Sequence, residues 1–125
     1  MSSEVIVLVV EDELIIRMMI QQALESGGYV SVTAGDGEEA LALLEQRNVE
    51  FRGFVTDIRL GRGPNGWELA RRARELEPEI AVVYVTGDSA DRWPAEGVPK
   101  SLVLEKPFAE AQLITAISTM LNGSA

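Results

Sequence analysis

The sequence predicts an α/β domain in which helices cover both faces of a five-stranded parallel sheet. Apolar runs rich in β-branched residues, such as Val5–Val10 and Ile80–Val85, are typical of parallel strands buried on both faces. These strand signals alternate along the chain with longer helical segments, an order that favours β–α–β units. Five such units account for the 125 residues, so we expect one domain over residues 1–125 and no second domain to carry an output.

The first strand is followed by a helix and an edge strand. Leu14–Leu24 is long enough for a helix, and the acidic residues 11–13 before it suit the positive end of a helix dipole. The glycine pair 27–28 is expected to end this helix. Tyr29–Ala34 then alternates in polarity, as half-exposed strands do.

The middle of the chain holds the second and third helices. Asp36 is expected to cap a helix over residues 37–44, whose alanine and leucine side chains form an apolar face. Phe51–Thr56 is the expected third strand. The glycine-rich segment 61–66 predicts a loop, and Trp67–Leu76 predicts a helix that a proline two residues later ends.

The last third of the chain completes the alternation. Ile80–Val85 is the expected fourth strand. Asp88–Gly97 has room for one short helix, because Pro94 limits its length. Leu102–Leu104 is the expected fifth strand, and Phe108–Leu121 is the expected last amphipathic helix.

The composition excludes several kinds of function. The chain contains neither cysteine nor histidine, and its formal net charge is −9. Disulfides, thiolate or imidazole metal sites and Ser-His or Cys-His catalysis are excluded, so any metal must be held by oxygen, as Mg²⁺ is. So acidic a domain is a poor partner for nucleic acid. No apolar run could span a membrane and no signal peptide is visible, so we expect no membrane partner and a cytoplasmic location.

Polar residues stand where the expected strands end. In open parallel sheets, ligands bind beyond these carboxyl ends. Three carboxylates, one hydroxyl and one ammonium group are therefore expected at one rim of the sheet. They are Glu11 and Asp12 after the first strand, Asp57 after the third, Thr86 after the fourth and Lys106 after the fifth.

This set of side chains suits phosphoryl transfer. Three neighbouring carboxylates repel one another, and a divalent cation such as Mg²⁺ relieves that repulsion. Lys106 and Thr86 can then contact oxygens of a phosphoryl group, while Asp57 is the nucleophile that forms an acyl phosphate. The expected metal ligands are the carboxylates of Asp12 and Asp57, a water held by Glu11, and the backbone carbonyl of Arg59.

Four motifs make the chain resemble the receiver-domain family of two-component signalling over nearly its whole length. They are Val9–Glu13 with its acidic pair, Phe54–Asp57, Val85–Gly87, and Glu105–Phe108 with its lysine–proline pair. The resemblance implies a flavodoxin-like fold with strand order 2-1-3-4-5, Mg²⁺ dependence and Asp57 as the phosphoacceptor. It also implies a histidine kinase or histidine phosphotransfer protein as the donor, and a cis peptide bond between Lys106 and Pro107.

Three positions depart from the family pattern. Gly61 stands where a proline is usual, and the loop reaches Gly66 one residue later than is typical. Val103 replaces an aromatic residue three positions before the lysine, so the usual threonine–aromatic switch is not expected. Tyr84, two residues before Thr86, resembles a subgroup with an aromatic-x-Thr-Gly fourth strand, although core packing also explains it.

The resulting hypothesis is a stand-alone receiver that takes a phosphoryl group from a kinase. Phosphorylation is expected to change the face formed by residues 88–121, which would then contact a downstream protein, and a homodimer is left open. Three alternatives stay open: a receiver cut from a hybrid histidine kinase, a flavodoxin-like binder of a nucleotide or flavin, and an interaction module without phosphorylation. The nucleotide binder is disfavoured because Glu11 and Asp12 would repel a phosphate without a metal.

Overall fold

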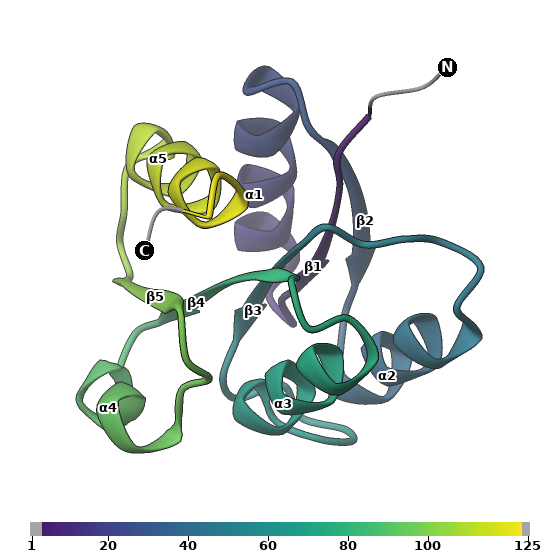
Figure 1. Ribbon diagram of the computed structural model, residues 1–125. Coiled ribbons are helices and arrows are strands. Elements are labelled where there is room, and N and C mark those ends of the chain that lie inside the picture. Colours follow the sequence, from purple (N-terminus) through teal and green to yellow (C-terminus); the bar gives the residue numbers. More distant parts are fainter. Residues whose placement is uncertain (1–3, 124–125) are drawn as a thin grey trace.

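The computed structural model describes residues 4–123, which form a sheet between two layers of helices (Figure 1). The strands are β1 (Ile6–Val10), β2 (Val30–Ala34), β3 (Gly53–Asp57), β4 (Ala81–Thr86) and β5 (Ser101–Glu105). The helices are α1 (Leu14–Ser26), α2 (Gly37–Gln46), α3 (Gly66–Leu76), α4 (Trp93–Glu96) and α5 (Glu110–Leu121), with the short 3-10 helix η1 (Ala90–Arg92) before α4.

The sheet has the order β2-β1-β3-β4-β5, and every neighbouring pair is parallel. The predicted fold class and strand order are therefore confirmed. Helices α1 and α5 lie on one side of the sheet, and α2, α3 and α4 lie on the other (Figure 1). The direction of strand progression reverses at β1, so the carboxyl ends of β1 and β3 flank the place where open sheets of this kind bind ligands.

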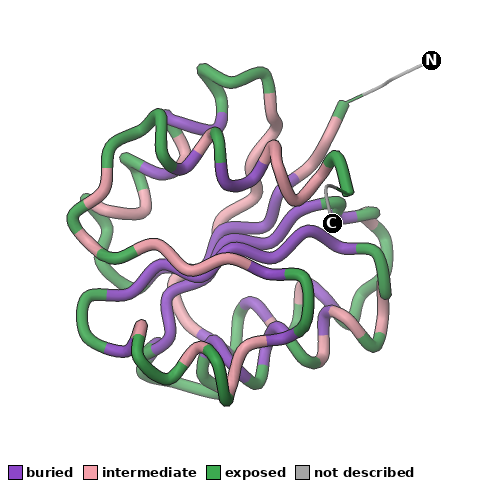
Figure 2. Tube along the Cα trace, turned by 60° about the vertical axis from the view of Figure 1, so that its left-hand side comes forward, coloured by how far each residue is buried: buried purple, intermediate pink, exposed green. Residues whose placement is uncertain are grey.

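Two hydrophobic clusters hold the layers together, one on each face of the sheet. Leu8, Phe54 and Tyr84 point into the cluster beneath α2 and α3, whereas Val7, Val9 and neighbouring strand residues pack against α1 and α5. The central strands are buried along their length and exposed residues lie at the periphery (Figure 2). This double burial explains the continuous apolar runs in the sequence.

The starts of α1 and α2 differ in whether a side chain caps them. The acidic residues before α1 precede its first turn, which contains no acid, and Glu13 makes no side-chain cap bond. The side chains of Glu11 and Asp12 lie instead in an acidic cluster with Asp57. The expected cap of α2 is present, since the Glu39 amide donates to Asp36 Oδ1 at 2.8 Å.

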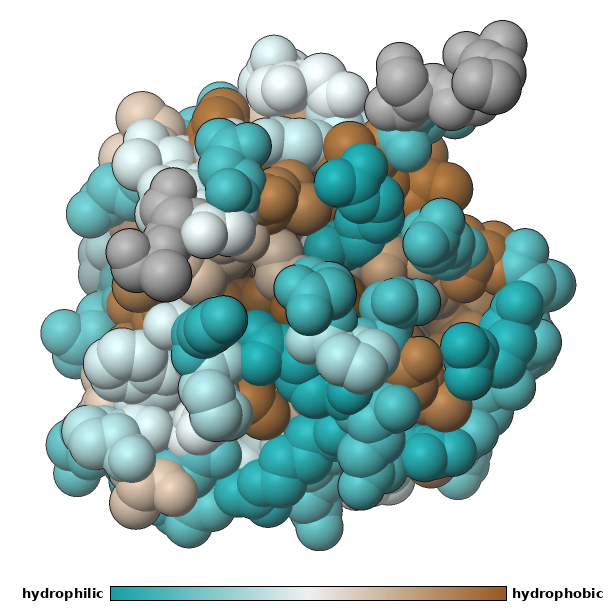
Figure 3. Space-filling model, viewed as in Figure 1, coloured by the Kyte–Doolittle hydropathy of each residue, from teal (hydrophilic) through white to brown (hydrophobic). Residues whose placement is uncertain are grey.

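The surface and one backbone feature bear on function. Hydrophilic side chains cover most of the face seen in Figure 3, as the net charge of −9 leads one to expect. No helix within residues 4–123 is both long and apolar enough to cross a membrane.

The peptide bond between Lys106 and Pro107 is cis, as the resemblance implied.

Candidate functional site

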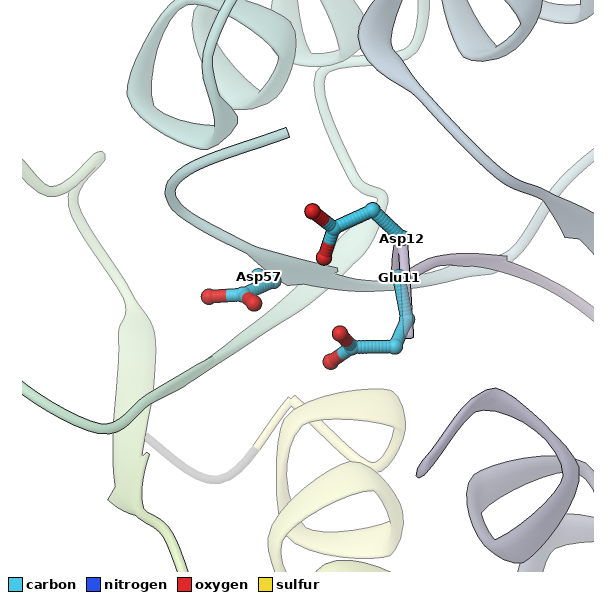
Figure 4. Close-up of side chains that lie close together, drawn as sticks. All are labelled: Glu11, Asp12 and Asp57. Carbon is cyan, nitrogen blue, oxygen red and sulfur yellow. The ribbon is translucent and has the colours of Figure 1, made fainter. Parts of the chain in front are cut away.

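Three carboxylates gather where β1 and β3 end. Glu11 and Asp12 follow the last residue of β1, and Asp57 is the last residue of β3. One carboxylate oxygen from each lies within 4.8 Å of the others, and the three groups border a common space (Figure 4). The strand register explains this arrangement. Val10 of β1 lies opposite Thr56 of β3, and the next residue after each is an acid, Glu11 or Asp57.

Lys106 brings the opposing charge. It follows β5 directly, and its Nζ lies 2.8 Å from Glu11 Oε1 and 3.0 Å from Asp57 Oδ2. A third carboxylate oxygen, Oε1 of Glu13, lies 3.9 Å from the same Nζ. One ammonium group therefore links two carboxylates that lie 46 positions apart in the sequence.

Burial sets the electrostatics of Glu11. The residue has no exposed surface, and its desolvation raises its pKa from 4.5 to about 7, with a further contribution from the charge of Asp57. The hydrogen bond from Lys106 lowers the pKa of Glu11 but does not cancel the effect of burial. Burial also lowers the pKa of Lys106, but its hydrogen bonds to Glu11 and Asp57 outweigh this, and the pKa of Lys106 is raised overall. Lys106 is therefore a cation at neutral pH.

The two oxygens of Asp57 have different environments. Oδ1 accepts a hydrogen bond from the amide of Ile58 at 2.6 Å, whereas Oδ2 accepts from Lys106. The residue is 9% exposed, so a ligand can reach it. The carboxylate is thus held in one orientation by its own backbone and by a cation.

Thr86 reaches the rim but faces its own loop. Its Oγ1 accepts hydrogen bonds from the amides of Asp88, at 3.3 Å, and Ser89, at 3.0 Å. These bonds tie the hydroxyl to the segment after β4. The sequence predicted the position of this hydroxyl at the end of the strand but could not predict its direction, because the loop amides that hold it are not a sequence pattern.

The side chain of Arg59 also points across the rim. Its guanidinium forms an ion pair with Asp88 at 3.0 Å, and both side chains are largely exposed. The pair connects the loop after β3 with the loop after β4. The predicted role of the Arg59 carbonyl as a metal ligand stays a prediction.

Two contributors were not foreseen from the sequence. Arg17 of α1 donates to the backbone carbonyl of Glu11 at 2.9 Å, and the amide of Glu13 donates to Glu11 Oε2 at 3.2 Å. Both contacts fix the turn that presents the acids. A single arginine within the otherwise apolar first turns of α1 was a signal that could have indicated Arg17.

The donor set fits a hard divalent cation. All three side chains offer carboxylate oxygens, which are the ligands that Mg²⁺ prefers, and Asp12 is exposed so that a hydrated ion can approach. The charges in the cluster also call for compensation beyond that of Lys106, since three acids face one ammonium group.

Comparison with known proteins identifies the family. The sequence profile of the response regulator receiver domain matches residues 7–118. The chain belongs to this family. Receiver domains are the phosphoacceptor modules of two-component signalling. The α/β fold and the acidic rim of this chain are compatible with membership of that family.

Two curated proteins and one solved structure are similar to the chain over nearly all of the chain's length. The response regulator receiver protein CpdR of Brucella abortus is 33% identical, and the match covers 92% of the chain and 95% of CpdR. The sensor kinase CckA of the same organism is 36% identical over 98% of the chain, which spans only 13% of CckA. A crystal structure of a receiver protein from Sinorhizobium medicae superposes with a TM-score of 0.92, at 40% identity and 96% coverage of both chains.

Proposed function

We propose that this receiver domain accepts a phosphoryl group on Asp57 in a reaction that depends on Mg²⁺. The observation that carries the proposal is the placement of Lys106, whose Nζ contacts both Asp57 and the buried Glu11. A cation at this point can neutralise a phosphoryl oxygen as the group arrives. The acidic cluster beside it supplies the complementary metal site.

In the proposed reaction, a carboxylate oxygen of Asp57 attacks the phosphorus atom of a phosphohistidine. An O–P bond forms, the P–N bond breaks, and the imidazole leaves with the electron pair of that bond. The products are an acyl phosphate on Asp57 and a free histidine on the donor. Because Oδ1 is held by the Ile58 amide, Oδ2 is the oxygen that we assign as the nucleophile.

The metal and the other residues have separate parts. Bound Mg²⁺ would supply positive charge to the phosphoryl oxygens, with Asp12 and Asp57 as direct ligands, Glu11 acting through water, and the Arg59 carbonyl as a further ligand. Lys106 would donate to a phosphoryl oxygen in exchange for its present contact with Asp57. Thr86 would have to turn away from the loop amides to donate to another oxygen, and this turn is the proposed beginning of the response.

The surface of α1 supports a protein as donor. Its first turns expose four large apolar side chains, and they begin two residues after Asp12. Exposed apolar patches of this kind mark contact surfaces. We call these residues the α1 patch: Leu14, Ile15, Met18 and Met19. We propose that a histidine kinase or histidine phosphotransfer protein docks there and brings its phosphohistidine over Asp57.

The remaining parts of the hypothesis concern location and output. We propose a cytoplasmic protein whose output is a changed protein contact through residues 88–121. The similarity to both CpdR and the receiver of CckA is compatible with a stand-alone protein and with a receiver from a hybrid kinase.

The proposal is tested by direct labelling. The chain is incubated with acetyl phosphate and Mg²⁺, and its intact mass is measured against a known receiver run in parallel. We expect one added phosphoryl group, no addition with EDTA, and no addition to Asp57→Asn. Thr86→Ser serves as a matched variant at the same rim that should still label. Equal labelling of Asp57→Asn and the unmodified chain would move the nucleophile elsewhere.

A further inference from the structure

The loop between β3 and α3 is anchored on both sides of Arg59. Ile58 and Leu60 are buried, at 3% and 2% exposure. The amide of Ile58 donates to Asp57, and its carbonyl accepts a hydrogen bond from the Gly66 amide at 2.8 Å. Arg59, whose carbonyl is the expected metal ligand, therefore lies between two fixed residues.

Farther along, the same loop touches the N-terminus of α2 with no space between the two backbones. The amide of Glu38 donates to the carbonyl of Arg62 at 3.1 Å. A methyl group at Gly37 would overlap the carbonyl oxygen of Pro64, and one at Gly63 would overlap the amide of Glu38. We call this contact between Gly37 and Gly63 and the opposing backbones the glycine seam.

The seam also requires an unusual backbone conformation at Gly63. Gly63 has a φ of +82°, a conformation that residues with a Cβ rarely adopt. The side chains of Arg62 and Glu38 add an ion pair at 3.4 Å, but both are exposed, so this pair contributes little. The close approach of the backbones is therefore what holds residues 62–64 of the loop, next to Gly61, which departs from the family pattern.

We propose that Gly37 and Gly63 are positioning residues for the cation site, because the seam fixes the loop that carries the Arg59 carbonyl. The inference rests on the proposed function, since it takes that carbonyl to be a ligand of Mg²⁺. Mg²⁺ requires near-ideal octahedral geometry, so a small displacement of one ligand weakens binding. Residues 61–63 are exposed, so the loop has room to move outward while the sheet stays folded.

Gly63→Asn in the full chain tests this role. Asparagine tolerates positive φ, so the variant introduces the overlap with little added backbone strain. Gly61→Asn is the matched control, because Gly61 has a φ of +73° and nothing within 4 Å of an added methyl group. Gly37→Ala tests the other side of the seam, and it decides the question if Gly63→Asn fails to fold.

Gly53→Ala separates positioning from loss of stability. Its methyl group would lie 3.0 Å from Val7 and 3.2 Å from Ile117, in the core beneath β3 and away from the loop. This variant should lower the melting temperature without moving the Arg59 carbonyl.

The readouts are the dissociation constant for Mg²⁺, from isothermal titration calorimetry, and the rate of labelling by acetyl phosphate as Mg²⁺ is varied. We expect Gly63→Asn and Gly37→Ala to weaken Mg²⁺ binding about tenfold, as loss of an outer-shell support does elsewhere. Labelling should recover at saturating Mg²⁺, and Gly61→Asn and Gly53→Ala should bind Mg²⁺ as the unmodified chain does.

Unchanged Mg²⁺ binding in both seam variants, or equal weakening in Gly53→Ala, would overturn the inference while leaving the proposed function intact. Failure of the unmodified chain to bind Mg²⁺ would contradict the proposed function itself, and the inference with it.

Discussion

At the scale of single residues, burial and charge oppose each other at Glu11. Its carboxyl group has no exposed surface, so water cannot stabilise the ionised form, and Lys106 compensates only in part. The pKa of about 7 means that the unfolded chain loses this proton at a lower pH than the folded chain does. When no metal is bound, ionisation of Glu11 therefore destabilises the folded protein relative to the unfolded chain.

This imbalance predicts a dependence of stability on pH in EDTA. Because the pKa of Glu11 is 4.5 in the ordinary state and about 7 in the fold, its contribution to the free energy of unfolding should fall as pH rises through this range. The fall between pH 5 and pH 7.5 is on the order of 2 kcal/mol, at about 1.4 kcal/mol for each pH unit over which only the unfolded chain has lost the proton. Urea unfolding at pH 5 and pH 7.5 measures it.

Glu11→Gln should remove most of that pH-dependent difference, since glutamine does not titrate. Glu13→Gln is the matched control, because Glu13 is exposed and lies near the same ammonium group. A slope that Glu11→Gln leaves unchanged would show that other groups determine it.

At the scale of elements, Tyr84 connects β4 to the segment after α4. The centroids of the Tyr84 and Trp67 rings lie 4.7 Å apart. The hydroxyl oxygen of Tyr84 accepts a hydrogen bond from the amide of Val98 at 3.1 Å. A neighbouring hydrogen bond joins α4 to β5, since Trp93 Nε1 donates to Ser101 Oγ at 3.0 Å. The aromatic residue two positions before Thr86 is thus both a core residue and an anchor for the chain between β4 and β5.

We expect Tyr84→Phe to destabilise the protein by about 1–2 kcal/mol, because the buried amide of Val98 would lose its partner. Hydrogen exchange should also quicken at Val98 and in α4. Tyr29→Phe provides the control, since it removes a tyrosine hydroxyl that contacts Ser118 on the other face of the sheet. Equal effects of both variants on exchange in α4 would argue against a specific anchor.

Which features could be predicted from the sequence depends on the range of the interactions that produce them. The strands and the residues at their ends were predictable, because apolar runs and their ends are local patterns. The glycine seam arises between distant segments, whereas the direction of the Thr86 hydroxyl and the contact of Arg17 with the Glu11 carbonyl depend on how a neighbouring turn or loop folds. The sequence does not specify these conformations, and it does not show which apolar residues in the first turns of α1 are left exposed.

At the scale of the whole molecule, the acidic rim and the α1 patch form neighbouring parts of one surface. The patch side chains are between 44% and 71% exposed, so they add little to the stability of the domain. Their position two residues beyond Asp12 makes them available to a protein that approaches the rim. A small phosphodonor would not need them.

Ile15→Gln should therefore separate the two kinds of donor. Labelling by acetyl phosphate and the melting temperature should stay unchanged, whereas transfer from an autophosphorylated histidine kinase that labels the unmodified chain should slow about tenfold. Ala42→Gln on the exposed side of α2 is the control. Equal rates for the two variants with the kinase would exclude the patch as its docking surface.

The order in which the site residues occur along the chain has a consequence for folding. Glu11 follows the first strand, and Lys106 follows the last one, which pairs only with β4 at the edge of the sheet. Contacts between such distant segments form late, after much of the chain has lost its freedom. During synthesis, the ammonium group cannot meet the carboxylates until the fifth strand has left the ribosome and joined the sheet. A nascent or truncated chain that lacks β5 should therefore accept no phosphoryl group from its donor, so only chains with all five strands in place should be phosphorylated.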